Sequence, residues 1–297
     1  MTEQLMGTGV ALVTPFKSDL SVDAKALCRL VEHCIEGGAD YLVALGTTGE
    51  SVTLAPHEKR LVMQTVSLAN AGQLPLVVGV GGNNTRAVVE ELREIDIMDY
   101  GAILSVSPAY NKPTQEGIYQ HFRALDAASP LPMIVYNVPS RTGSNMLPGT
   151  TLRLARDCDN IIAIKEAIDD SSQVAQLIAE APSGFQVISG DDSSSLSTVL
   201  TGGAGVISVL GQALPSEFSR MIALGLNGDA ESAQAIYRFL LPGMKLAFEE
   251  GNPTGVKAIL ELLGICSSRV RLPLVPASDG LKQRIHKFLV HEHTIEV

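Results

Sequence analysis

Short apolar runs recur along the chain, and each ends at Gly, Pro, Asn, Asp or Thr. Segments with helical periodicity lie between them, for example residues 23–36, 56–71 and 85–97. Strands that alternate with helices indicate βαβ units and a parallel sheet. The eight runs are GVALVTPF from Gly9, YLVALGTTGE from Tyr41, LPLVVGVGG from Leu74, YGAILSVSPAY from Tyr100, LPMIVYNVP from Leu131, IIAIKEA from Ile161, FQVISGDD from Phe185 and GAGVISVLG from Gly203.

Eight such units in roughly 220 residues predict an α/β fold, a closed (β/α)8 or TIM barrel. A doubly wound open sheet is the competing fold, and it usually has a Gly-rich phosphate turn after an early strand. GVGGNN at Gly79 does not fit, because it ends in Asn84 where the motif needs glycine. We predict a catalytic barrel over residues 1–224. Residues 225–297 show only helical periodicity, interrupted at GNPTG and LPLVP, which predicts a small C-terminal helical domain.

The 297 residues carry a net charge of −10, which disfavours nucleic acid and anionic membranes as partners. No apolar run approaches the ~18 residues of a membrane span. The first residues lack the pattern of a secretory signal, and the four cysteines form no CxxC motif. We therefore expect a reduced, cytoplasmic protein with buried thiols. We expect no cofactor and no metal site, and we interpret the one close histidine pair, His291 and His293, as a frayed chain end.

Lys165 is the most unusual residue of the apolar runs, because it directly follows four apolar residues. Such a run is typical of a strand that is buried on both faces. Lysine is almost never fully buried unless it is paired. Glu166 is adjacent, but neighbours on a strand point to opposite faces, so it is a poor partner for Lys165.

The active site of a (β/α)8 barrel lies at the C-terminal ends of its strands. Residues with reactive or ligand-binding side chains end several of the predicted strands. We therefore expect them to meet at one mouth of the barrel. They are Thr47 and Thr48 after the second strand, Tyr110 after the fourth, Tyr136 and Arg141 at the fifth, Lys165 on the sixth, and Gly190, Asp191 and Asp192 after the seventh.

These residue types suit chemistry on a carbonyl compound. An unperturbed lysine has a pKa near ~10.4, and burial lowers it by up to about 3–5 units. The neutral amine is a nucleophile that forms a Schiff base with a carbonyl substrate. The imine then accepts electrons from the adjacent carbon, with Tyr136 and Thr47 available as a proton relay. Arg141 is suited to bind a carboxylate through two hydrogen bonds.

Each residue also has a plain structural interpretation. On that interpretation, Lys165 reaches solvent at the rim, Tyr136 packs in the core, and Arg141 forms a surface ion pair. The GTTG segment is then only a turn, and Asp191 and Asp192 cap a helix. TGGAGVISVLG would bind phosphate, as loops of barrels often do. Their joint placement at one rim is what favours an active site.

With these residues, the chain resembles the dihydrodipicolinate synthase and N-acetylneuraminate lyase superfamily of pyruvate-dependent lysine aldolases. The resemblance covers nearly the whole chain. It implies a (β/α)8 barrel with a C-terminal helical domain, usually assembled as a homotetramer of tight dimers. The segments that carry it are ALVTPF, LGTTGES, SPAYNKPTQEGIYQHF, YNVPSRTG, IIAIKEA, ISGDD, GVISV, NPTGVK and RLPLVP.

The resemblance also implies roles for individual residues. Lys165 would form the Schiff base with pyruvate, and Tyr136 would exchange protons with it. Thr47 would link Tyr136 to Tyr110 from the neighbouring subunit. The remaining positions would bind substrates: Thr48 the pyruvate carboxylate, Arg141 the carboxylate of the second substrate, and Gly190 and Ile207 through backbone contacts.

Arg141 in YNVPSRTG resembles the synthases, which condense pyruvate with L-aspartate 4-semialdehyde on the route to diaminopimelate and lysine. The alternative within the superfamily is an aldolase or lyase for a sugar-derived 2-oxo acid, such as N-acetylneuraminate or 2-keto-3-deoxygluconate. A barrel that only senses a 2-oxo acid is disfavoured by the full set of Lys165, Tyr136 and Thr47. A phosphate-binding isomerase barrel would form no imine.

One departure from the family pattern concerns regulation. Some synthases are inhibited by lysine at the tight-dimer interface, through a serine, two histidines, an asparagine, a glutamate and the first tyrosine of a pair. Only two of the matching positions keep the pattern, so we predict that lysine does not inhibit this protein, although Glu58 or Glu90 could replace the missing carboxylate. The matching positions are Ser51, Pro56, Lys59, Asn83, Ala87 and Ala109.

Overall fold

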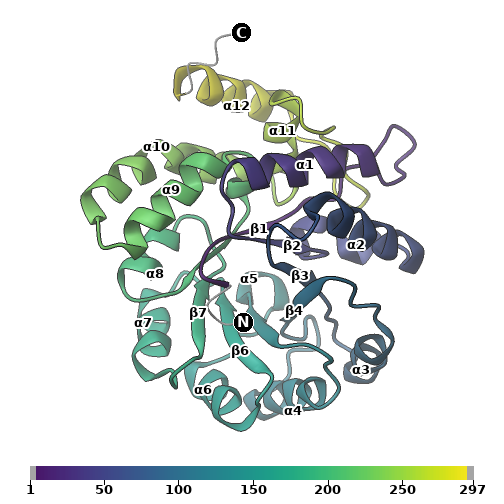
Figure 1. The fold of residues 1–297 in the computed structure, drawn as a ribbon, viewed down its shortest axis with the longest axis vertical. Coiled ribbons are helices and arrows are strands. Elements are labelled where there is room, and N and C mark those ends of the chain that lie inside the picture. Colours follow the sequence, from purple (N-terminus) through teal and green to yellow (C-terminus); the bar gives the residue numbers. More distant parts are fainter. Residues whose placement is uncertain (1–4, 293–297) are drawn as a thin grey trace.

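Eight parallel strands form a closed barrel in a computed structural model that describes residues 5–292 (Figure 1). Each strand pairs with the next along the chain, and β8 pairs with β1. The predicted (β/α)8 barrel is therefore confirmed. Seven of the predicted apolar runs contain one strand each, and the first overlaps β1, which begins two residues before the predicted start at Gly9. The strands are β1 (Gly7–Ala11), β2 (Tyr41–Ala44), β3 (Leu76–Gly79), β4 (Tyr100–Val106), β5 (Met133–Asn137), β6 (Ile161–Glu166), β7 (Gln186–Ser189) and β8 (Gly205–Ser208).

Helices surround the barrel. The helix predicted over residues 85–97 ends earlier, at Glu94, because Ile95 takes an extended conformation and the chain turns into β4. The helices are α1 (Ala24–Glu36), α2 (Pro56–Asn70), α3 (Thr85–Glu94), α4 (Gln115–Asp126), α5 (Pro139–Thr142), α6 (Pro148–Asp157), α7 (Ser171–Glu180), α8 (Ser195–Leu200), α9 (Pro215–Leu226), α10 (Ala230–Phe248), α11 (Thr254–Leu262) and α12 (Asp279–Glu292), with 3-10 turns η2 (Thr47–Gly49), η3 (Ser51–Thr53) and η4 (Leu210–Gln212).

The apolar residues form two buried clusters. The smaller cluster fills the barrel interior and includes Tyr41, Ile134 and Ile188. Gly9 makes room for the Tyr41 ring, since a Cβ at Gly9 would lie 2.2 Å from that ring. The larger cluster lies between the barrel and its helices. Strands buried on both faces explain why the runs in the sequence are continuously apolar rather than alternating.

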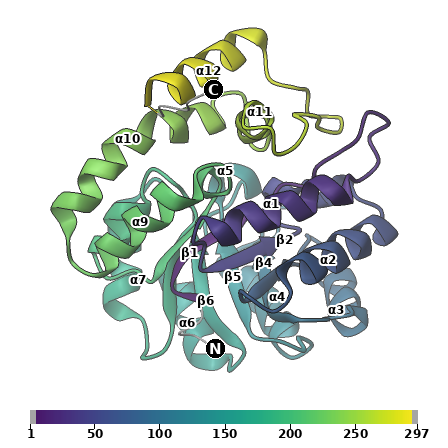
Figure 2. The ribbon, with the colours of Figure 1, turned by 45° about the horizontal axis from the view of Figure 1, so that its top comes forward.

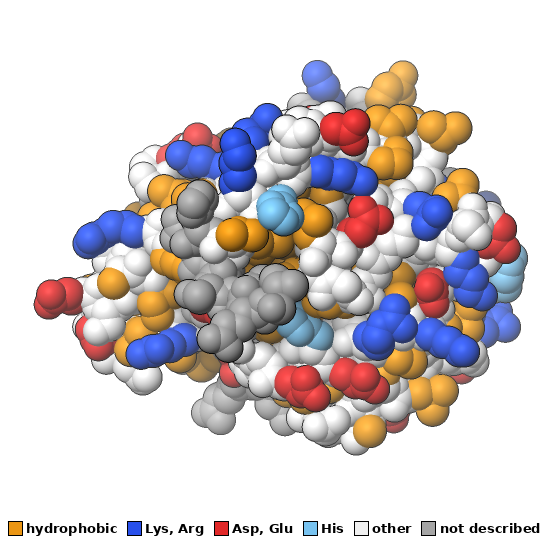
Figure 3. All heavy atoms as spheres, turned by 90° about the horizontal axis from the view of Figure 1, so that it is seen from above, with side chains coloured by type: hydrophobic (Ala, Val, Ile, Leu, Met, Phe, Trp, Pro, Cys, Tyr) orange, Lys and Arg blue, Asp and Glu red, His pale blue; other side chains and the backbone are white. Residues whose placement is uncertain are grey.

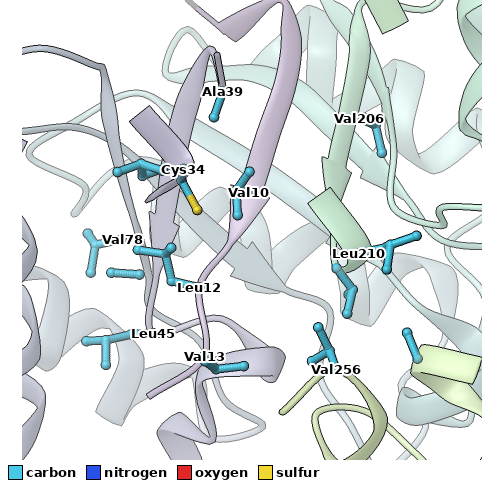
Figure 4. Packing of buried hydrophobic residues seen from close by; sticks show 14 of the residues in the cluster. Val10, Leu12, Val13, Cys34, Ala39, Leu45, Val78, Val206, Leu210 and Val256 are labelled. Carbon is cyan, nitrogen blue, oxygen red and sulfur yellow. The ribbon is translucent and has the colours of Figure 1, made fainter. Parts of the chain in front are cut away.

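The C-terminal helices α10, α11 and α12 form a layer beyond the barrel, seen at the top of Figure 2. Val256 of α11 belongs to the same buried cluster as Val13 and Leu210, the residues labelled together with it in Figure 4. This layer is therefore packed onto the barrel. The predicted boundary at residues 224 and 225 falls near the end of α9, which packs against β1, and it stays a prediction.

Lys and Arg side chains lie among Asp and Glu side chains on the face seen from above in Figure 3. All four cysteines are free, and Cys28 is partly exposed while the other three are buried. Within residues 5–292 no helix combines the length and apolar character needed to cross a membrane. His293, one member of the histidine pair noted in the sequence, lies outside the described residues.

Candidate active site

A cavity of about 180 Å³ lies at the C-terminal ends of the strands. Six of the predicted site residues line it, and they come from five separate segments of the chain. The barrel therefore brings them together as expected from the strand ends. These six are Thr47, Thr48, Tyr136, Arg141, Lys165 and Gly190, and Asp191, which was also expected at this mouth, lines the cavity as well.

Lys165 lies in β6 and is only 5% exposed. Its β5 partner in the strand register is Tyr136, and the Lys165 Nζ atom lies 4.5 Å from the centroid of the Tyr136 ring. Burial lowers the pKa of Lys165 to about 8, although the Asp192 charge acts in the opposite direction. At pH 7 roughly one amine in ten is then neutral, against about one in 2,500 for an unperturbed lysine. This lysine is therefore a competent nucleophile near neutral pH.

Gly190 follows β7 and allows the Lys165 side chain to lie close to the backbone. A Cβ at Gly190 would lie 3.0 Å from Lys165 Cε and 2.7 Å from the Ala167 Cβ. Any larger residue at position 190 would displace the lysine stem. The close approach of the Lys165 side chain thus explains the glycine at this strand end. Backbone conformation does not, since Gly190 is not left-handed.

Tyr136 is the next-to-last residue of β5, and its side chain lines the cavity. Burial raises the pKa of the Tyr136 phenol, while the nearby charge of Arg141 and a hydrogen bond with the Thr47 side chain act to lower it. The phenol is therefore protonated at neutral pH and can donate a proton to a bound substrate. Thr47 is itself exposed, in the turn that follows β2.

Thr48 is buried beside Thr47, and its hydroxyl accepts a hydrogen bond of 2.9 Å from Asn252 Nδ2. Asn252 also lines the cavity, and its buried Oδ1 has no hydrogen-bond partner among the described residues. The sequence analysis missed Asn252 as a site residue, although it belongs to the NPTGVK segment quoted there. Asn252 is about two hundred residues from Thr48 in the chain, so no local sequence pattern indicated that the two side chains meet.

Asp191 and Asp192 do not act as a pair of helix caps. The Asp191 carboxylate accepts a hydrogen bond from the Ser194 amide, whereas the buried Asp192 carboxylate accepts from the amides of Val209 and Leu210. Burial raises the pKa of Asp192 to about 6. Asp192 therefore occupies the two amides after β8 that a phosphate group would need, which disfavours the phosphate-binding alternative.

Arg141 is exposed at the mouth of the cavity, in the short helix α5. Its positive charge lowers the pKa of both Lys165 and Tyr136. A cation at the entrance favours an anionic substrate, because a charged guanidinium binds a carboxylate through two parallel hydrogen bonds.

Glu166 points away from Lys165, as the strand geometry predicted. Its buried carboxylate accepts hydrogen bonds from Asn137 Nδ2 at 2.7 Å and Gln173 Nε2 at 3.2 Å. Burial raises the pKa of Glu166 to about 7. This polar cluster behind the barrel wall joins the strands that carry Tyr136 and Lys165.

Two predicted residues do not line the cavity. Tyr110 is 90% exposed and has a left-handed backbone with φ of 73°. Ile207 is fully buried within β8, where it pairs with Gly9, and its role in substrate binding stays a prediction. A second cavity of about 170 Å³ opens beside the first and is lined by Thr47, Val52 and Tyr136.

Known proteins resemble this chain over nearly its full length. A 4-hydroxy-tetrahydrodipicolinate synthase from Flavobacterium psychrophilum is 54% identical over 286 residues, which are 96% of this chain and 98% of that protein. The crystal structure of dihydrodipicolinate synthase from Thermotoga maritima is 38% identical with a TM-score of 0.94, covering 97% of this chain and 99% of that one. The chloride-inhibited dihydrodipicolinate synthase from Acinetobacter baumannii, solved with pyruvate, is 36% identical with a TM-score of 0.94 and the same coverage. The sequence model of the Dihydrodipicolinate synthetase family matches residues 4–292. The chain therefore belongs to the Dihydrodipicolinate synthetase family.

Proposed function

We propose that this protein has 4-hydroxy-tetrahydrodipicolinate synthase activity, forming a Schiff base between Lys165 and pyruvate and condensing it with L-aspartate 4-semialdehyde. The observation that carries the proposal is a buried lysine, with its pKa lowered to about 8, in one cavity with Tyr136 and Arg141. The names of the most similar relatives support this choice within the family.

The chemistry follows from these groups. The neutral Lys165 Nζ attacks the ketone carbon of pyruvate, and loss of water leaves a protonated imine. The imine nitrogen accepts the electron pair when the methyl group loses a proton, so no cofactor or metal is required for this step. The resulting enamine attacks the aldehyde carbon of the second substrate. Tyr136, hydrogen-bonded with Thr47, is positioned to move the protons.

A direct comparison of substrates tests the activity. We expect turnover with pyruvate plus L-aspartate 4-semialdehyde in a coupled assay, and no comparable cleavage of N-acetylneuraminate or 2-keto-3-deoxygluconate. The physical reason is Arg141 at the cavity mouth, which suits a short substrate with a carboxylate. Efficient cleavage of a sugar acid without synthase turnover would establish the alternative aldolase activity instead.

The proposed assembly is a homotetramer built from tight dimers. Tyr110 and Val52 are large apolar residues that are 90% and 95% exposed in the single chain. Thr47 is also exposed, beside the second cavity. A second copy that inserts Tyr110 toward Thr47 would cover these groups and extend the hydroxyl chain from Tyr136.

Mixed oligomers provide the test of this arrangement. A Tyr110→Phe chain and a Lys165→Ala chain are each expected to have low activity, because each lacks one group of every site. Co-refolded mixtures should regain part of the activity, since some sites then combine the intact Lys165 of one chain with the intact Tyr110 of the other. No recovery, with mixed dimers confirmed by mass spectrometry, would place Tyr110 in the site of its own subunit.

Some synthases of the family bind free L-lysine through side chains that are replaced in this chain. Pro56, Lys59 and Ala87 line one surface hollow of about 660 Å³. Lysine has two ammonium groups that require acceptors. Ala87 supplies none, and Lys59 contributes a positive charge, which is paired with Glu91 at 3.2 Å.

The two carboxylates that could replace the missing glutamate already have cationic partners. Glu58 binds Arg271, and this contact lowers the pKa of Glu58 to about 2. Glu90 accepts a hydrogen bond of 2.8 Å from Arg86 on the same helix. Ala109 also provides no aromatic surface for the lysine stem. Neither Glu58 nor Glu90 is therefore free to replace the missing glutamate.

We accordingly expect the initial rate to be insensitive to added L-lysine at fixed substrate concentrations. Two lost contacts of about 1.5 kcal/mol each weaken binding on the order of 100-fold. An L-lysine titration provides the measurement, with sodium chloride at equal ionic strength as the control. Half-inhibition below roughly 1 mM, which corresponds to about −4 kcal/mol of binding free energy, would contradict this prediction.

A further inference from the structure

The turn that carries Thr47 and Thr48 ends in an unusual residue. Glu50 follows η2 and has a left-handed backbone with φ of 52°, although it is not glycine. Its amide donates a hydrogen bond of 3.1 Å to the Thr47 carbonyl, so its conformation determines how the turn closes. A left-handed conformation is unfavourable for a residue with a Cβ, and such conformations persist where surrounding contacts impose them.

The contacts that impose it come from the C-terminal helical segment. Lys257 of α11 donates a hydrogen bond of 2.5 Å to one oxygen of the Glu50 carboxylate, and the backbone amide of Arg271 donates to the other at 2.9 Å. Lys257 is fully buried, and Glu50 is 3% exposed. Both carboxylate oxygens are thus bound by donors far away in the chain.

The two donors to Glu50, Lys257 and Arg271, are themselves held in place by further contacts. Lys257 Nζ also donates to the Arg269 carbonyl at 2.8 Å and lies 4.2 Å from the centroid of the Phe16 ring. The Arg271 guanidinium lies 4.5 Å from the same ring centroid. A cation held by an anion, a carbonyl and an aromatic face has little freedom to move.

A buried ion pair is weak evidence for stability, because the cost of removing two charges from water offsets their attraction. Such a pair instead fixes the position of the carboxylate, since the carboxylate must lie where both donors can reach it. The same C-terminal segment makes a second contact with the turn, because Asn252 donates a hydrogen bond to the Thr48 hydroxyl. The turn is therefore fixed at two points by residues outside the barrel.

We propose that Glu50 and Lys257 are a pair of positioning residues that hold the Thr47–Thr48 turn in its pyruvate-binding conformation. The C-terminal helical segment is then part of the framework of the substrate site and not only a cover for the barrel. This inference rests on the proposed function, because it takes Thr47 and Thr48 as residues of the pyruvate site.

Four variants of the full chain test the proposal. Glu50→Gln replaces one carboxylate oxygen with an amide NH2 group, which cannot accept a hydrogen bond, so one of the two contacts is lost. The double variant Glu50→Gln/Lys257→Met leaves no unpaired buried charge and is expected to melt at a higher temperature than Lys257→Met alone. Glu116→Gln is the control, since it removes a carboxylate that pairs with Arg153 and lies on α4, away from the turn and its donors.

The measurements are the melting temperature and the pyruvate dependence of both turnover and borohydride trapping on Lys165. We expect Glu50→Gln and the double variant to raise the KM for pyruvate and the half-saturation of trapping about tenfold. Glu116→Gln should change both constants less than about twofold, because it removes only an exposed ion pair.

A double variant with restored stability and wild-type pyruvate constants would overturn the proposal and leave the pair a purely structural role. Equal effects of Glu50→Gln and Glu116→Gln on the pyruvate constants would overturn it as well. The wild-type sample separates this outcome from failure of the proposed function. If the wild-type protein forms no pyruvate adduct, the proposed function fails and this inference fails with it. If the wild-type protein forms the adduct but the variants keep wild-type constants, only the proposed role of Glu50 and Lys257 is wrong.

Discussion

Lys165→Ala is expected to abolish synthase turnover and to remove the pyruvate adduct that borohydride traps on the wild-type protein. The substitution deletes the nucleophile, and the remaining groups cannot form an imine. Loss of a covalent nucleophile costs up to roughly 10⁶-fold in other enzymes, so we expect a decrease in kcat of at least about 10³-fold. Mass spectrometry of the reduced wild-type protein should map a three-carbon adduct to Lys165.

Lys245→Ala, at an exposed position of α10, is the control and should keep both the adduct and the activity. The pH dependence gives an independent check. With a pKa of about 8, the neutral fraction of Lys165 rises from pH 6 to pH 9, so the trapping rate should rise through that range and then level. An adduct on another lysine, or a trapping rate that is flat over this range, would contradict the assignment.

The barrel could be predicted because its determinants are local. Strands buried on both faces give continuous apolar runs, and the turn residues that end them mark each βα unit. The rim residues followed from the same pattern, since parallel strands in a barrel end at one mouth. Lys165 was conspicuous because a charged residue in such a run requires an explanation, and the structure supplies one in the cavity beside Tyr136.

Contacts between distant segments could not be predicted in this way. Asn252 reaches Thr48, and Lys257 reaches Glu50, only because α10 and α11 fold back over the barrel. Hydrophobic periodicity indicates that a helix has a buried face, but it does not say which turn of another segment that face covers. The partners of Asp192 could not be predicted for a similar reason, because they lie after the next strand instead of in the next helix.

The exposure of Tyr110 is another feature that could not be predicted from the sequence. The sequence gives no physical reason for Tyr110 to lie 90% exposed while the other site residues surround a cavity. A buried aromatic would be expected from its apolar character alone. A residue that completes its site only in an assembly looks unexplained in a single chain, and this is the physical basis for the mixed-oligomer experiment.

Arg141→Ala is expected to impair the second half-reaction much more than the first. Arg141 lies at the mouth of the cavity, where it can bind the carboxylate of L-aspartate 4-semialdehyde. Loss of a charge-assisted contact of this kind costs about 1.5–3 kcal/mol, so kcat/KM for the semialdehyde should fall roughly 10- to 150-fold. The maximal extent of borohydride trapping, reached at a pH where Lys165 is neutral, should remain close to that of the wild type.

The charge of Arg141 predicts one further change in the same variant. That charge lowers the pKa of Lys165, so its removal should raise this pKa and shift the pH profile of trapping toward higher pH. Arg141→Lys is the matched control: it keeps the charge but loses the two parallel hydrogen bonds, so it should restore the trapping profile without restoring full kcat/KM. If Arg141→Ala instead reduces trapping of pyruvate and kcat/KM for the semialdehyde equally, Arg141 serves pyruvate or the fold, and its assignment to the second substrate is wrong.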